Sequence, residues 1–116
     1  MARMIELESP RLKPRQAADA GLTISEKKFA NKVVNYLRKH GWHVQRNGWV
    51  GVGNQYMKGF PDLVCVRGVV LFVELKTAIG KLRPPQEEWR DWIIAANGRW
   101  ELWRPQDWDA IKQRYQ

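Results

Sequence analysis

Two stretches of sequence decide the fold: GFPD at residues 59–62 and VVLFVELK at residues 69–76. On an extended chain, side chains two residues apart share a face, so Glu74 and Lys76 project together. A tight turn between the stretches predicts an antiparallel hairpin that returns Asp62 to Glu74. Charges at the ends of buried strands are costly unless a metal or a substrate compensates them. The pattern predicts such a site, the alternative being a Glu/Lys pair on a solvated strand end.

The combined motif resembles a known family. A Pro-Asp pair at the start of one apolar strand and a Glu-x-Lys at the end of the next form the PD-(D/E)xK nuclease pattern. The fuller string resembles the VRR-NUC branch, the virus-type replication-repair nucleases, over about residues 25 to 104. The residues that carry the resemblance are Lys58-Gly59-Phe60-Pro61-Asp62-Leu63, Glu74-Leu75-Lys76-Thr77, Gly80-Lys81-Leu82, Pro84, Gln86 and Trp89.

The resemblance implies an α/β fold of the restriction-endonuclease type, with a mixed sheet flanked by helices, and a phosphodiesterase that uses Mg²⁺ or Mn²⁺. It implies these metal ligands: Asp62, Glu74 and the backbone carbonyl of Leu75. By the same analogy Lys76 orients or activates the attacking water, while Glu26 and Gln86 complete the catalytic set from two helices. The chain departs from the family at Arg83, where a Ser or Thr helix cap is expected.

Two of these positions have simpler interpretations. Glu26 falls in the apolar stripe of a helix that Ser25 caps, but an acid in a first turn is also favoured by the helix dipole. Gln86 is in the first turn of a helix opened by two prolines, where capping explains it as well as catalysis does. Both interpretations stay open at this point.

The charge distribution predicts a nucleic-acid partner. The chain of 116 residues carries a net charge of +8, and residues 25–58 hold seven Lys or Arg against one Glu. A basic half of this kind suits a phosphate backbone. The residues expected to contact DNA are Lys28, Lys32, Lys39, Tyr56 and Lys58. For Tyr56 and Lys58, a solvated loop at residues 51–60 is an equal alternative.

The chain divides into an N-terminal arm, residues 1–24, and a nuclease domain, residues 25–116. The arm contains Pro10 and Pro14 and shows no sustained hydrophobic period, so we expect a linker or a segment ordered against a partner subunit. In the domain we expect a helix from Ser25, a strand within residues 42–50, the hairpin, a helix from Pro84, a strand at 99–104 and a terminal helix. Because residues 69–73 are apolar on both faces, helices should cover both sides of the sheet.

The tryptophans and the cysteine fit a packed interior. Trp89, Trp92 and Trp108 occupy expected helix core positions, and Cys65 between valines is expected to be a buried free thiol. Trp100 and Trp103, with Trp108 and the arm, offer a homodimer interface; core packing is the plainer account. A two-fold dimer would place two centres on opposite strands of a four-way junction. We therefore expect branched DNA, first a Holliday junction, with a flap or simple duplex as the alternative.

Other function classes are weighed against this hypothesis. A non-catalytic basic DNA-binding module would share the charge but needs no Asp62, Glu74 and Lys76. A protein that binds an acidic partner would explain the charge and not the carboxylate pair. The sequence contains no stretch apolar enough to span a bilayer and no signal-peptide pattern, so a cytoplasmic location without membrane contact is expected, in a host cell if the protein is viral.

Overall fold

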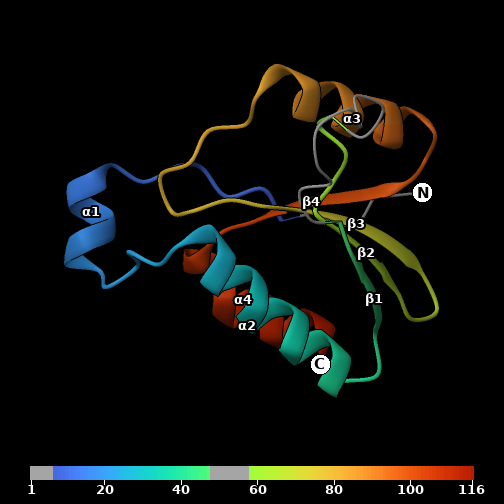
Figure 1. The fold of residues 1–116 in the computed structure, drawn as a ribbon, viewed down its shortest axis with the longest axis horizontal. Coiled ribbons are helices and arrows are strands. Elements are labelled where there is room, and N and C mark those ends of the chain that lie inside the picture. Colours follow the sequence, from blue (N-terminus) through green and yellow to red (C-terminus); the bar gives the residue numbers. More distant parts are fainter. Residues whose placement is uncertain (1–6, 48–57) are drawn as a thin grey trace.

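The computed structural model describes residues 7–47 and 58–116. They form a four-stranded mixed sheet in the order β1-β2-β3-β4, with helices against both faces (Figure 1). The first two pairs of strands are antiparallel, and β3 and β4 are parallel. The strands are β1 (His43–Arg46), β2 (Leu63–Val66), β3 (Val70–Leu75) and β4 (Arg99–Trp103). The α/β class and the mixed sheet predicted from the sequence are confirmed.

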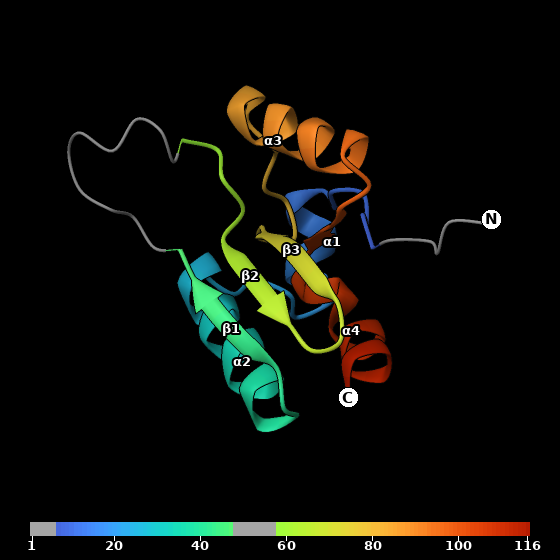
Figure 2. The ribbon, with the colours of Figure 1, turned by 90° about the vertical axis from the view of Figure 1, so that its right-hand side faces the viewer.

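The central hairpin has the predicted register. Leu63 pairs with Val73 in this antiparallel hairpin. Asp62, the residue before Leu63, therefore lies opposite Glu74, the residue after Val73. The turn between the strands needs Gly68, whose φ of 70° lies in the left-handed region. Figure 2 shows β1, β2 and β3 side by side, so that the carboxylates meet at one end of the sheet.

Helix α2 (Glu26–Lys39) begins and ends where the sequence indicates. The Ser25 side chain accepts a hydrogen bond from the Lys28 amide at 3.1 Å, and Gly41 follows the helix with a φ of 85°. Its buried face packs on the sheet together with α4 (Trp108–Tyr115). Glu26, in the first turn of α2, is close enough to Asp62 for the charge of Asp62 to help raise the pKa of Glu26.

Two separate cores cover the two faces of the sheet. Alternate residues of β3 point to opposite sides: Leu71 and Val73 pack against α2 and α4, and Phe72 packs with the residues of α3 (Pro84–Ala95). Figure 1 shows α3 on one side of the sheet and α2 with α4 on the other. The coverage of both faces, expected from the doubly apolar strand, is confirmed.

The tryptophans divide between core and surface. Trp100 and Trp103 are 1% and 0% exposed, so core packing is the correct account and these two side chains are not available to an interface. Trp92, expected in the core, is instead 57% exposed. The reason is that Ile93 takes the buried position of α3, which turns Trp92 outward and leaves it edge-to-face on Trp89.

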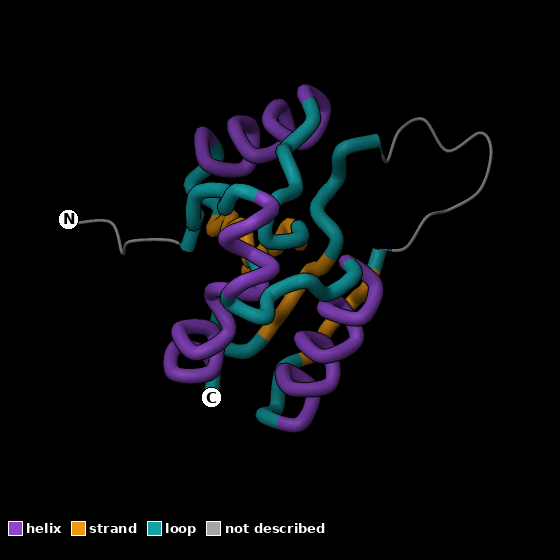
Figure 3. The backbone as a smooth tube through the Cα atoms, turned by 90° about the vertical axis from the view of Figure 1, so that its left-hand side faces the viewer, coloured by secondary structure: helices purple, strands orange, loops and turns teal. Residues whose placement is uncertain are grey.

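The described part of the N-terminal arm is ordered against the protein's own domain. The Leu102 amide donates to the Leu7 carbonyl at 2.9 Å, and Glu8 forms a parallel bridge with Leu102. A six-residue helix, α1 (Pro14–Asp19), follows, where the sequence predicted none. Figure 3 views the molecule from the side on which α1 lies. Six residues are too few to display a hydrophobic period; Pro14 at the first position and the Lys13 amide bond to Gln16 Oε1 start the helix instead.

The strand expected within residues 42–50 is present as β1 (His43–Arg46). β1 ends at Arg46, and the residues from Gly48 to Met57, including most of the expected loop, lie outside the described part of the chain. In the described residues, no helix combines the length and the apolar character needed to cross a membrane.

Candidate metal centre

The hairpin brings Asp62 and Glu74 together. Asp62 Oδ2 accepts a hydrogen bond from the Leu75 amide at 2.8 Å, so the aspartate is tied to the strand that carries the glutamate. Glu74 is 1% exposed, and its Oε1 accepts a hydrogen bond from Gln86 Nε2 at 2.9 Å. Its second oxygen, Oε2, is buried without a hydrogen-bond partner within the described structure. A buried unpaired carboxylate oxygen is costly and calls for a ligand.

The electrostatics of the pair follow from this geometry. Burial and then the charge of Asp62 raise the pKa of Glu74 to about 10, and the positive charge of Lys76 partly offsets this. Burial also raises the pKa of Asp62, against the lowering effect of the Leu75 amide. A buried glutamate and a half-buried aspartate that repel each other favour a cation between them.

Gln86 has two functions at once. Its Oε1 accepts a hydrogen bond from the Arg83 amide at 2.8 Å, which caps α3, and its Nε2 holds Glu74. The two interpretations left open by the sequence, capping and a place in the site, are therefore both present in the geometry. Arg83 offers no side-chain cap, so Gln86 supplies one half of a capping box, the bond to the amide of the residue before the helix, and the half that a Ser or Thr would supply is missing.

Glu26 and Lys76 approach the pair from two directions. Lys76 is buried, with 9% of its surface exposed, and its amide donates to the Trp103 carbonyl at 3.1 Å. Glu26 remains open to solvent in the first turn of α2, yet surrounding protein atoms and then the charge of Asp62 raise its pKa, while Lys76 lowers it. Glu26 is therefore within electrostatic influence of Asp62 and Lys76, although it is exposed and not buried with the apolar stripe.

Sequence reasoning missed Asn47, which fixes the segment leading into Asp62. Its amide donates to the Asp62 carbonyl at 2.7 Å and its Nδ2 donates to the Pro61 carbonyl at 3.0 Å. In the sequence Asn47 precedes a glycine and suggested only a turn. No local pattern relates it to residues so far along the chain.

Packing requires a glycine at position 59. A Cβ at this position would lie 2.3 Å from the Pro85 carbonyl carbon, and the φ of Gly59 is 81°. The backbone therefore crosses the start of α3 at a distance that only glycine allows. This crossing brings the helix that carries Gln86 against the segment that carries Asp62.

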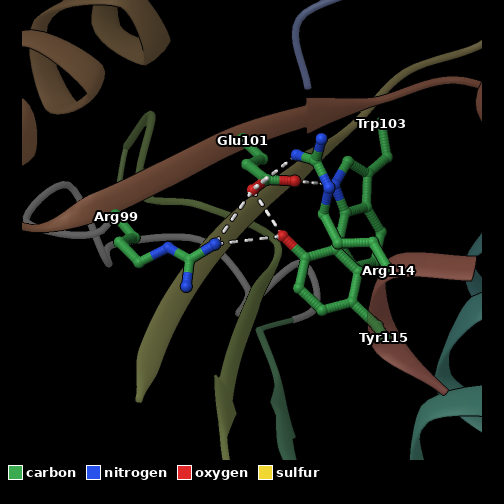
Figure 4. Close-up of polar contacts among 5 residues, drawn as sticks. All are labelled: Arg99, Glu101, Trp103, Arg114 and Tyr115. Atoms are coloured by element: carbon green, nitrogen blue, oxygen red, sulfur yellow. Dashed lines mark hydrogen bonds and ion pairs between the residues drawn. The ribbon is translucent and has the colours of Figure 1, made fainter. Parts of the chain in front are cut away.

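A second buried carboxylate provides an internal comparison. Glu101 on β4 is 0% exposed and lies among polar partners (Figure 4). Trp103 Nε1 donates to its Oε1 at 2.8 Å, and the Tyr115 hydroxyl donates to its Oε2 at 2.5 Å. Arg99 and Arg114 place nitrogens 3.7 and 3.9 Å from Oε2. Every oxygen of Glu101 is paired within the protein, whereas Glu74 Oε2 is not.

Comparison with known proteins places the fold. A solved structure described as a VRR_NUC domain aligns with a TM-score of 0.61, covering 78% of this chain and 97% of that chain at 21% sequence identity. This chain has the VRR-NUC fold. No family model matches the sequence, and no curated protein matches it. The fold expected from the motif resemblance is thereby confirmed, at an identity that shows the fold alone.

Within this VRR-NUC fold the residues expected to contact DNA are spread along the molecule. Lys28, Lys32 and Lys39 are all exposed on α2, a span of about 16 Å at 1.5 Å per residue. The Lys32 ammonium lies 4.7 Å from the centre of the Trp108 ring of α4. Lys58 is exposed, and its carbonyl accepts from Trp89 Nε1 at 3.2 Å; Tyr56 lies outside the described residues.

Proposed function

We propose that this protein is a divalent-metal-dependent nuclease that hydrolyses phosphodiester bonds in DNA. The observation that carries the proposal is the unpaired, buried Oε2 of Glu74 beside Asp62. The contrast with Glu101 shows that this fold pairs a buried carboxylate fully where the role is structural. The likeness to a VRR_NUC domain supports the same chemistry.

The donor set fits Mg²⁺ or Mn²⁺. In the described residues, no three His, Cys, Asp or Glu side chains are grouped closely enough to hold an ion by themselves. Mg²⁺ does not need such a cage, because it retains several waters and is commonly held by one or two carboxylates. Asp62, Glu74 and the carbonyl of Leu75 would hold it. When bound, the ion supplies positive charge to the phosphate and lowers the pKa of a water.

The protein's own groups supply orientation and charge. The Leu75 amide fixes one oxygen of Asp62, and Gln86 fixes one oxygen of Glu74, so the free oxygens are presented in a constant arrangement. Lys76 places its ammonium beside the charge that develops on the phosphate in the transition state. Glu26 faces the same region from α2, where its raised pKa suits proton transfer with water.

DNA is the substrate that the charge favours. The net charge of +8 and the exposed lysines of α2 would follow the phosphate backbone, beginning at the end of the helix that faces the carboxylates. One small chain offers one centre, so cutting both strands of a branched molecule requires two chains. We propose a homodimer that prefers branched DNA, a Holliday junction first and a flap or duplex second.

Digestion of a DNA panel tests the activity. Duplex, single-strand, flap and four-way junction DNAs are incubated with Mg²⁺ or Mn²⁺, with EDTA as control. We expect Asp62→Ala, Glu74→Ala and Lys76→Ala each to slow cleavage at least ~10²-fold while DNA binding is kept. Lys112→Ala, on α4 with its side chain 43% exposed, is the matched control and should cleave normally.

The outcomes separate the alternatives. Wild-type cleavage by any of the three site variants, in metal-purified samples, removes the site assignment. Binding without cleavage by the wild-type protein indicates the non-catalytic DNA-binding module. Light scattering gives the mass, and separately labelled junction strands give the cut pattern. A monomer that nicks junction and linear duplex equally well removes the resolvase proposal and leaves a general nuclease.

A further inference from the structure

The loop that follows Lys76 is held at four successive carbonyl groups. Four residues in succession, Thr77–Gly80, have carbonyl oxygens that accept hydrogen bonds from outside the loop. Arg104 Nη1 donates to the first and the fourth at 2.7 and 2.6 Å. The Leu12 amide donates to the second at 2.9 Å, and Arg11 Nε donates to the third at 2.9 Å.

Arg104 is the centre of this arrangement. It is 3% exposed, and its Nε donates to the Ser9 carbonyl at 3.0 Å. Asp107, itself 5% exposed, accepts from the Arg104 amide and from the Ser9 hydroxyl. The Arg104 guanidinium therefore joins the loop after Lys76 to the N-terminal segment, and the Arg104 amide bonds to Asp107 in the turn after β4. A buried charge of this kind is retained only when its hydrogen bonds are satisfied.

The loop in turn bears on the lysine. The Lys76 amide bonds to the carbonyl of Trp103, the residue before Arg104. The Lys76 side chain passes over Gly80: a Cβ on Gly80 would lie 3.5 Å from Lys76 Cδ and 3.0 Å from Thr77 Oγ1. A shift of the loop would therefore move the aliphatic stem that directs the ammonium.

We propose that Arg104 and the segment 9–12 form a clasp that positions Lys76 for reaction. Arg104 is a positioning residue, since it reaches the site only through the loop. The proposal rests on the proposed nuclease function for the role of Lys76, but the clasp itself is a property of the fold. Through this clasp, the N-terminal segment supports the active centre of its own chain.

A double-mutant cycle separates positioning from simple stabilisation. Arg104→Lys keeps the charge, but a single ammonium cannot make the Nε bond to Ser9 and the two Nη1 bonds to the loop at once. In single-turnover cleavage with saturating metal and DNA, we expect a rate loss of about 10-fold and a change in DNA affinity below about 3-fold. In a Lys76→Ala background the same substitution should cost nothing further. Equal losses in both backgrounds would overturn the proposal.

Arg67→Lys is the matched control. Arg67 Nη1 also donates to a backbone carbonyl, that of His40, at 2.8 Å, but it lies at the hairpin turn, at the other end of β3 from Lys76. We expect its cleavage rate to equal that of the wild type. If Arg104→Lys does not fold, Arg11→Ala removes a single clasp bond at an exposed position and should show the same pattern to a smaller degree.

Amide hydrogen exchange tests the clasp without reference to cleavage. In Arg104→Lys, exchange at residues 76–80 should be at least about 10-fold faster, with β2 and α2 unchanged. Unchanged protection of the loop would overturn the clasp even if the enzyme is active. If the wild-type protein cleaves no DNA, the proposed function fails, and faster loop exchange would still establish the clasp.

Discussion

Replacing Glu74 by glutamine should stabilise the metal-free protein while it removes metal binding. Glutamine has the same shape, and its Oε1 can keep the hydrogen bond from Gln86 Nε2. Its Nε2 would stand where the unpaired Oε2 now lies and could donate to Asp62. The substitution therefore removes a buried, repelled acid without opening a cavity.

The size of the effect follows from the pKa of Glu74. In the metal-free fold burial and then Asp62 raise this pKa from 4.5 to about 10. Between these values the folded state holds a proton that the unfolded state has released, so stability falls as pH rises, by about 1.4 kcal/mol per pH unit. At pH 7 this amounts to about 3 kcal/mol as an upper value, and we expect a gain of about 1 to 3 kcal/mol for Glu74→Gln.

Urea unfolding in EDTA, followed by tryptophan fluorescence from pH 5 to 8, measures the difference between the two proteins. The advantage of Glu74→Gln should grow with pH, because glutamine does not titrate. Glu101→Gln is the control: Glu101 is equally buried but fully paired, so its loss should destabilise. A variant less stable than the wild type at pH 7, or a difference that does not change with pH, would refute the reasoning. Mn²⁺ titration should show that binding is lost.

Three further predictions concern other parts of the molecule. Reversing the charge of the exposed α2 lysines should flatten the dependence of DNA affinity on salt, and an unchanged slope would mean that α2 faces away from DNA. Those lysines are Lys28, Lys32 and Lys39. Tyr115→Phe should cost about 1.5 to 3 kcal/mol in urea unfolding, because it removes a donor to the buried Glu101 carboxylate; a loss below about 0.5 kcal/mol would contradict this. Cys65, whose pKa burial and then the Glu101 charge raise to about 12, should react with a thiol reagent at pH 8 only as fast as the protein unfolds.

The hairpin could be predicted because its determinants are local. The alternation of apolar residues, the turn glycine and the spacing of Asp62 and Glu74 together fix which residues face each other across two neighbouring strands. The Ser25 cap and the two prolines before Gln86 likewise act within one turn of a helix. Such signals need no knowledge of the rest of the fold.

The rotation of a helix against its sheet is not local in this sense. The sequence predicted Trp92 in the core, because it lies near the apolar stripe of α3. Which part of a broad stripe is buried depends on how far the sheet extends beneath the helix and on what else competes for the surface. Here Ile93 is buried, and Phe60 packs edge-to-face on Trp89, so Trp92 is left in solvent.

The sequence by itself determined the hairpin, the starts of α2 and α3 and the pair of acids, since each depends on residues within about a dozen positions. Only the tertiary structure decided which polar groups complete the centre. Asn47, which follows β1, reaches the segment before Asp62, and Arg104, which follows β4, reaches the loop after Lys76. It also decided that Glu101 is paired and that Glu74 is not. Hydrogen bonds between distant segments form only where the packing of helices on the sheet brings those segments together. Hydrophobic pattern and spacing do not indicate where that happens.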